Sequence, residues 1–404
     1  MLDFKHMSPI EKLKGLREAC RRGDDDLAIS FLTHGAEAGA SIGRSAATPL
    51  GWACSKDRLG VVNELCDRGA NPWMAADKEG NTAWHVAIMN SAHQSLCAMG
   101  SRFKSFTSPN KGIYSPLHAA IRISARKTLG TKMPDSAKLL ESIRVLAHNF
   151  LLDEVDGWGF SPLASAAREG LVDVMAVLLD AGADPNQRSI NGVTPLMIAS
   201  KCDSGACAML LARGADPLLV DASSATAFHW AVKRGSAEAV AALGNGAVLT
   251  MSDVDGKLAL ERLDGNGFTP LMRAASNGSE ELVLALLDAG ADPNARGQFG
   301  RSALMACKKD TRMCGLLLSR GADPLLVDED GSTALHWAVE RGCSEAIIAL
   351  AAGAAMEMRD RGGLTAAQRA ADAPLSERAK ACLESGVIGM GISVDGAEAR
   401  RMRL

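Results

Sequence analysis

The stretch GADPLLVDEDGSTALHWAVERG, residues 321–342, nearly repeats the earlier stretch GADPLLVDASSATAFHWAVKRG, residues 214–235. Both belong to a longer series, because a six-residue phrase of the type TPLHxA recurs along the chain, mostly every 31 to 34 residues. Its copies are TPLGWA (48), TAWHVA (82), SPLHAA (115), SPLASA (161), TPLMIA (194), TAFHWA (226), TPLMRA (269), SALMAC (302), TALHWA (333) and TAAQRA (365). A second phrase, GADP or GANP, follows many of them about 20 residues later. A period of this length indicates a stack of small structural units.

Each unit has the signals of two short helices. Thr or Ser precedes the first helix as an N-cap, and Pro often follows at the first helical position, where no N–H is needed. Apolar residues at helical spacing, as in LVDVMAVLLDAGADPN (171–186), indicate a second helix. The Gly of GADP supplies the positive φ that ends it. Turn sequences such as DEDGST (328–333) predict an extended loop before the next unit.

Composition agrees with packed helices. Hydrophobic residues make up 47% of the 404 residues, but aromatic residues only 4%, so the core consists of small aliphatic side chains. Such a core suits closely packed helices better than a sheet sandwich. No apolar stretch approaches 18 residues, and the first 20 residues contain no apolar signal-peptide segment, which predicts neither a membrane span nor a Sec signal peptide. The ten cysteines form no CxxC pair, which favours a reducing cytosol.

The paired phrases resemble the ankyrin repeat family over about residues 16–385. The resemblance implies an all-α solenoid of about ten to eleven helix–loop–helix repeats with projecting β-turn fingers and a concave groove. In that family the His of TPLH ties neighbouring loops together, which here implies a structural role for His85, His118, His229 and His336. The other repeats carry Gly51, Ala164, Met197, Met272, Met305 or Gln368 at this position, so we expect them to be locally softer.

The repeats are themselves duplicated as a block. Ser161, Thr194 and Thr226 match Thr269, Ser302 and Thr333 at offsets of 107 or 108, so a block near 158–243 is duplicated near 266–350. Two interruptions break the period, at 115→161 and at 244–268, and the first falls between the two helices of its repeat. We expect one N-terminal helix at about 8–34 to cap the stack. The predicted organisation is a cap and degenerate repeat (1–47), repeats (48–114), a repeat with a basic insertion (115–160), a triplet (161–243), a truncated repeat (244–268), the duplicated triplet (269–350), a capping repeat (351–385) and a tail (386–404).

No catalytic constellation accompanies the repeats. The sequence contains no HExxH, GxxxxGK[ST] or GxSxG motif. Cys202 and Cys207 lie five apart, whereas their counterparts Cys307 and Cys314 lie seven apart, a drift that favours a core role over metal binding. We therefore predict no enzyme activity, no cofactor and no metal, with an enzyme hidden in the basic insertion as a remote alternative.

A protein partner is the leading prediction, and the resemblance places it on the finger tips and on the exposed ends of the first helices. Carried over position by position, the candidate partner-binding residues are Tyr114, Trp158, Phe160, Ile190, Phe268, Phe299 and Arg301 at the fingers, and Arg122, Arg168, Lys201, Lys233, Arg234 and Arg341 at the helix ends. Exposed aromatic side chains are typical interface anchors, but they also pack onto neighbouring fingers, and both interpretations remain open. For Trp52, Trp230 and Trp337 we favour packing.

The charge distribution supplies a second hypothesis. The net charge is −3, yet residues 101–150 hold nine Lys or Arg against two Asp or Glu. The 102–138 segment, with Arg122, Arg126, Lys127 and Lys132, is either a solvated loop or a contact for an acidic protein or for nucleic acid, of which nucleic acid is the weaker alternative. The expected function is non-catalytic protein binding in the cytoplasm, such as that of a bacterial or viral effector or inhibitor that sequesters a host complex and is delivered into the host cytosol. Self-association stays open, and no membrane partner is expected.

Overall fold

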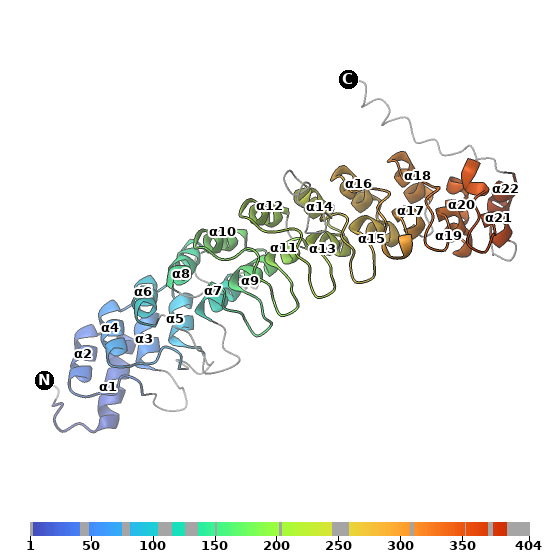
Figure 1. The fold of residues 1–404 in the computed structure, drawn as a ribbon. Helices are drawn as coiled ribbons and strands as arrows, with labels where there is room; N and C mark the ends of the chain where they lie inside the picture. The colour runs from blue at the N-terminus through green and yellow to red at the C-terminus, as the bar shows by residue number, and fades with distance from the viewer. Residues whose placement is uncertain are drawn as a thin grey trace, which may run out of the picture. The chain divides into compact units, whose positions relative to one another are not determined.

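The computed structural model describes residues 3–40, 48–74, 81–103, 115–125, 136–149, 152–201, 204–244, 258–307, 311–351, 353–370 and 375–385. Within these ranges the chain forms helices that follow one another as short pairs joined by loops (Figure 1). The chain divides into two compact units, an N-terminal unit of residues 1–199 with 209–216 and a C-terminal unit of residues 200–208 with 217–404. The all-α repeat architecture expected from the sequence is confirmed, with eleven helix pairs in the described residues.

The N-terminal unit contains α1 (Pro9–Arg22), α2 (Asp25–Thr33), α3 (Pro49–Ser55), α4 (Leu59–Asp67), α5 (Ala83–Met89), α6 (His93–Arg102), α7 (Pro116–Ala125), α8 (Ser136–Asn149), α9 (Pro162–Arg168), α10 (Val172–Asp180) and α11 (Pro195–Ala199). First helices pack on first helices, as α3 does on α5 and α9 on α11, and second helices on second helices, as α4 does on α6. The helix α12 (Ser204–Ala212) has residues in both units.

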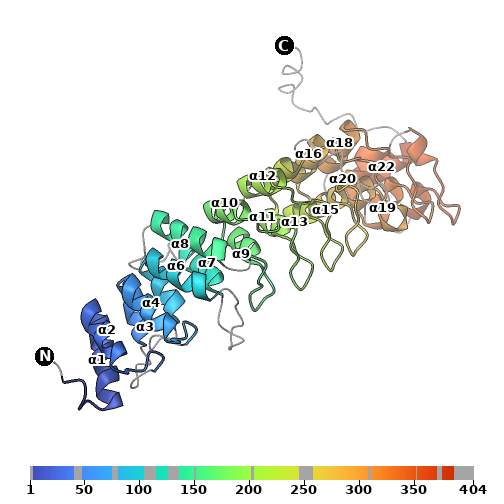
Figure 2. The same ribbon diagram turned by 60° about the vertical axis from the view of Figure 1, so that its left-hand side comes forward.

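The C-terminal unit contains α13 (Ala227–Arg234), α14 (Ala237–Leu243), α15 (Pro270–Asn277), α16 (Glu280–Asp288), η3 (Gln298–Gly300), α17 (Ala303–Ala306), α18 (Thr311–Ser319), α19 (Ala334–Glu340), α20 (Ser344–Leu350), η4 (Gly353–Met356), α21 (Ala366–Arg369) and α22 (Glu377–Ser385). The loops that precede α13, α15 and α17 project from one side of these helices (Figure 2). Here α13 packs on α15, and α14 on α16, so the two copies of the triplet are in direct contact across the 244–268 interruption.

The predicted caps form as their chemistry requires. The hydroxyl groups of Thr48, Ser161 and Thr269 accept hydrogen bonds from backbone N–H groups three residues later, and Pro occupies the first helical position in each case. These bonds satisfy N–H groups that lack a partner within the helix. At the other end of the unit, the Gly of GADP has positive φ in every described copy, as at Gly182 (95°) and Gly321 (86°).

One boundary expectation was wrong. The sequence predicted a single helix at about 8–34, but the structure has two, α1 and α2, because Gly23 adopts φ 76° and ends α1. Asp24 then caps α2 by accepting a hydrogen bond from the Leu27 N–H group. The chain therefore already forms a helix pair at its N-terminal end.

The interruption at 115→161 falls between the two helices of its repeat, as expected. Helix α7 ends at Ala125 and α8 starts at Ser136, and the loop between them, 126–135, lies outside the described residues. Part of the additional length is helical, because α8 has 14 residues where α10 has nine. The predicted tail 386–404 lies outside the described residues.

The core consists of small aliphatic side chains, as the composition predicts. Leu50, Val62 and Leu96 are completely or almost completely buried in the N-terminal unit, as are Val240 and Leu286 in the C-terminal unit. Of the cysteines in the described residues, all but Cys97 are buried and none is in a disulfide. Cys202 lies outside the described residues. Within the described part of the chain, no helix is both long and apolar enough to cross a bilayer.

Candidate functional site

Each finger is a five-residue turn closed by backbone hydrogen bonds. In the finger of residues 156–160, the Asp156 N–H donates to the Phe160 carbonyl at 2.9 Å, and the same bond recurs at Asp221, Asp264, Asp328 and Asp360. The carboxylate then accepts two further backbone N–H groups inside its own turn. In the finger of residues 264–268 these come from Asn266 (2.9 Å) and Phe268 (3.1 Å). The fingers are thus preformed, which lowers the entropy lost when a partner binds.

In these five fingers, the same aspartate ties the finger to the helix that follows it, through the residue nine positions later. Trp230 Nε1 donates to Asp221 at 2.9 Å, and Trp337 Nε1 donates to Asp328 at 2.8 Å. In the other fingers the partner is Ser165 for Asp156, Arg273 for Asp264 and Arg369 for Asp360. An Asp–x8–(Trp/Arg/Ser) spacing in the sequence marks this link. This spacing is the signal by which Arg273 and the finger aspartates, which were not among the predicted residues, can be found in the sequence.

These hydrogen bonds also lower the pKa of Asp221 and of Asp264. Burial disfavours ionisation of Asp221, but hydrogen bonds from Ser223, Ala225 and Trp230 outweigh burial and lower its pKa. Burial is likewise outweighed at Asp264, whose pKa is lowered by hydrogen bonds from Arg273 and Phe268. Asp221 and Asp264 therefore remain ionised carboxylates that are engaged inside the protein.

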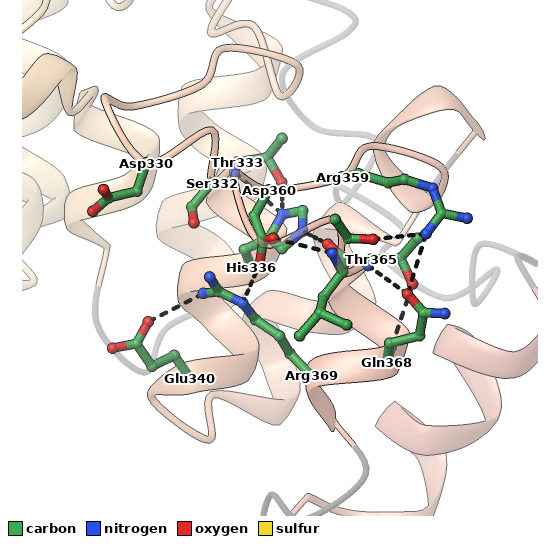
Figure 3. A network of polar contacts seen from close by, with 12 residues as sticks. Asp330, Ser332, Thr333, His336, Glu340, Arg359, Asp360, Thr365, Gln368 and Arg369 are labelled. Atoms are coloured by element: carbon green, nitrogen blue, oxygen red, sulfur yellow. Dashed lines mark hydrogen bonds and ion pairs between the residues drawn. The ribbon is translucent and has the colours of Figure 1, made fainter.

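The histidines of the TPLH-type phrases connect neighbouring repeats. His336 Nδ1 lies 2.8 Å from the Thr333 hydroxyl and accepts the Thr333 N–H at 3.2 Å, so Nε2 carries the proton and donates to the Leu364 carbonyl at 3.1 Å (Figure 3). His118 and His229 make the same link to the Phe160 and Phe268 carbonyls, both at 3.0 Å. Burial lowers the pKa of all three imidazoles. Their role in these contacts is structural. In the described residues no group of three or more His, Cys, Asp or Glu is placed to hold a metal ion.

In the N-terminal unit the structure brings several candidate partner-binding residues together. The Arg168 guanidinium lies 5.3 Å from the centre of the Trp158 ring and 5.4 Å from that of Phe160. Trp158 is 56% exposed and Ile190 is 81% exposed. Ile190 packs against the finger at Gly159, where an added Cβ would lie 2.5 Å from Ile190 Cγ1. Trp158 and Ile190 thus form an exposed apolar surface that the Arg168 guanidinium borders. Phe160 next to it is half-buried.

The C-terminal unit carries a second set. Arg301 stacks on Trp337 at 4.2 Å and lies 5.7 Å from the Phe299 ring, while Arg341 lies on Trp337 at 4.9 Å. Lys201 Nζ lies 3.8 Å from the centre of Trp230. Trp230 and Trp337 are half-buried, so they pack, as we favoured, and also present a ring face to a cation.

The remaining candidates fall into three groups. Phe268 is half-buried beneath Arg273, whose guanidinium lies 4.8 Å from the ring centre. Lys233 and Arg234 are exposed in the last turn of α13, and Arg122 is half-buried on α7. The last group, Tyr114, Arg126, Lys127 and Lys132, lies outside the described residues.

The described ends of the basic region are engaged in ion pairs. Arg102 Nε lies 2.8 Å from Asp67 Oδ1, and Arg144 Nη1 lies 2.7 Å from Glu141 Oε2. These two positive charges are therefore compensated within the protein.

Comparison with known proteins identifies the family. The family model for ankyrin repeats (3 copies) matches residues 16–101, 107–221, 163–253, 196–297, 285–361 and 303–386. The chain belongs to the ankyrin repeat family, whose repeats generally mediate protein–protein interactions and are mainly non-catalytic.

Several proteins share part of the chain. An ankyrin repeat-containing protein of Treponema pallidum is 33% identical over 132 residues, which are 32% of this chain and 41% of that protein. Cyclin-dependent kinase 4 inhibitor B of Bos taurus is 37% identical over 102 residues, 24% of this chain and 78% of the inhibitor. Among solved structures, the ankyrin repeat domain of Bcl-3 covers 56% of this chain and 99% of its own at 27% identity, with a TM-score of 0.49.

Proposed function

We propose that this chain is a non-catalytic binding protein that holds a protein partner against its fingers and the exposed ends of its first helices. The observation that carries the proposal is the pairing of exposed finger aromatics with cations, as in Trp158 with Arg168 and Phe299 with Arg301. Large exposed aromatic side chains and arginine are the residue types that dominate binding energy at protein interfaces. Here they lie on a preformed scaffold, so little ordering accompanies binding.

We further propose that binding inhibits the partner by sequestering it in the cytosol, either that of the cell that makes the chain or that of a host. Support comes from the partial similarity to a bacterial ankyrin protein and to a protein named as a kinase inhibitor. The free cysteines of the described residues are compatible with a reducing compartment. Nothing in the described residues favours nucleic acid over protein.

The test is affinity capture from cell lysate, with and without nuclease, using the wild type and a Trp158→Ala/Phe299→Ala variant. Both side chains are more than half exposed, so their removal should leave the core intact. The control is an Ile10→Ala/Leu325→Ala variant, which removes two exposed apolar side chains that are not on the finger tips.

The expected result is a discrete protein that survives nuclease, is retained by the control and is lost with the finger variant. The proposal is wrong if only nucleic acid is recovered. It is also wrong if the finger variant and the control capture the partner equally.

A further inference from the structure

A polar cavity of about 490 Å³ lies in the C-terminal unit between two neighbouring fingers. Its walls come from the fingers at Asp221 and Asp264, and from helices α13 and α15, which contribute Trp230, Lys233 and Arg273. The cavity therefore sits where the first copy of the triplet meets the second.

The acidic groups of this cavity have partners. Asp221 accepts hydrogen bonds from Trp230 Nε1 and from the Ser223 and Ala225 N–H groups, at 2.8–3.0 Å. Asp264 is paired with Arg273 and accepts two backbone N–H groups. Both carboxylates are therefore already engaged inside the protein.

Lys233 is the exception. It is exposed at the wall of the cavity, and within the described residues it has neither an ion pair nor a hydrogen bond. A second cation is close, because Lys201 Nζ lies on the ring of Trp230. The cavity thus offers an unpaired positive charge beside an indole and two carboxylates that are already engaged.

The second copy of the triplet has an equivalent site, but the position of Lys233 carries a negative charge there. Trp337, Asp328, Asp360 and Arg369 stand where the first copy has Trp230, Asp221, Asp264 and Arg273, but Glu340 replaces Lys233. Glu340 Oε2 lies 3.6 Å from Arg369 Nη1, and Arg369 Nε lies 2.6 Å from Asp360 (Figure 3).

The finger that begins at Asp328 is also more acidic than its counterpart at Asp221, since Glu329 and Asp330 stand where the first copy has Ala222 and Ser223. The second copy therefore supplies from its own chain the carboxylate that the first copy lacks.

We propose that the cavity at Lys233 binds a carboxylate side chain, Asp or Glu, of an acidic segment of the protein partner. The partner's carboxylate takes the role that Glu340 has in the second copy. The inference rests on the proposed function and names the chemistry of the partner. A protein carboxylate fits better than a nucleic acid phosphate, because it is the group that Glu340 places at the equivalent point of the second copy.

The test uses a fluorescein-labelled hexaglutamate peptide as the probe and measures binding by fluorescence anisotropy at low salt. Lys233→Glu is expected to weaken binding at least tenfold, and Lys233→Gln less. The matched control is Glu340→Lys, which opens the equivalent place in the second copy and is expected to strengthen binding. Circular dichroism of each variant verifies that the exposed substitutions leave the helices intact.

Equal binding by the wild type and Lys233→Glu overturns the proposal. It is also overturned if a hexathymidine oligonucleotide binds more tightly than hexaglutamate and is lost with Lys233→Glu, since the cavity then recognises phosphate. In the capture assay, a partner that is lost with the finger variant but retained by Lys233→Glu refutes the carboxylate site alone. Failure to capture any protein refutes the proposed function, whatever the peptide result.

Discussion

Trp337 donates its indole N–H to Asp328 at 2.8 Å, so the residue that begins a finger is fixed to the helix that follows it. The equivalent pair, Trp230 and Asp221, has nearly the same distance, 2.9 Å. This relationship explains how a loop with little core of its own keeps one shape. Stability and recognition are therefore coupled in these repeats.

Replacing Asp328 by Ala is expected to destabilise the protein by about 1–3 kcal/mol, because the Trp337 indole and the finger N–H groups lose their acceptor. Asp328 is only 6% exposed, so water replaces the acceptor poorly. Urea denaturation followed by circular dichroism measures the change. Glu329→Ala, in the same finger but exposed, should have an effect near zero, and equal losses in both variants would contradict the explanation.

Stability is expected to depend on pH through the linking histidines. Burial lowers the pKa of His336 in the folded state, so below its ordinary pKa, about 6.5, the unfolded chain binds more protons. The free energy of unfolding should therefore decrease as the pH falls from about 7 towards 5, by up to about 1.4 kcal/mol per pH unit for each such histidine.

The measurement is a series of urea titrations between pH 5 and 8 on the wild type and on His336→Gln. The difference in unfolding free energy between them should be largest at pH 8 and shrink towards pH 5. His6→Gln, which alters an exposed histidine near the N-terminus, serves as the control. A difference that grows on acidification would reverse the assigned sign.

Glu154 is expected to act in the opposite direction. Burial raises its pKa to about 7, and its Oε2 atom is buried without a hydrogen-bond partner. Between about pH 4.5 and 7 the folded state binds the additional proton, so the free energy of unfolding decreases as the pH rises through this range, and above pH 7 the whole loss remains. Glu154→Gln should raise the melting temperature at pH 8 and change it little at pH 5. An equal effect at both values would exclude ionisation as the cause.

Phe299 is expected to serve binding rather than stability. Its backbone has φ 60°, in the left-handed region that disfavours most side chains, and its ring is 52% exposed. Phe299→Asn, which tolerates this conformation better, should leave the free energy of unfolding unchanged or raise it by up to about 1 kcal/mol. The same variant should weaken capture of the partner. Clear destabilisation in thermal denaturation would instead identify Phe299 as a packing residue.

Much of the repeat could be derived from the sequence because its signals are local. Thr-Pro caps, helical spacing of Leu and Val, and the Gly of GADP depend on neighbours within a few residues. These local signals therefore predicted the helix pairs, the cap positions and the all-α class. The N-terminal error has the same origin, since Gly23 ends a helix within a stretch whose apolar pattern continues.

The sequence by itself also determined the duplication and the identities of most finger and helix-end residues. Only the tertiary structure decided which of them meet. Arg168 lies over Trp158 of its own repeat, and Arg301 reaches Trp337 of the next repeat, through the packing of finger loops against helices. The ion pair of Glu340 likewise depends on Arg369, which belongs to the next repeat. Contacts between repeats depend on packing geometry, whereas the repeat itself is fixed by local turn and helix chemistry.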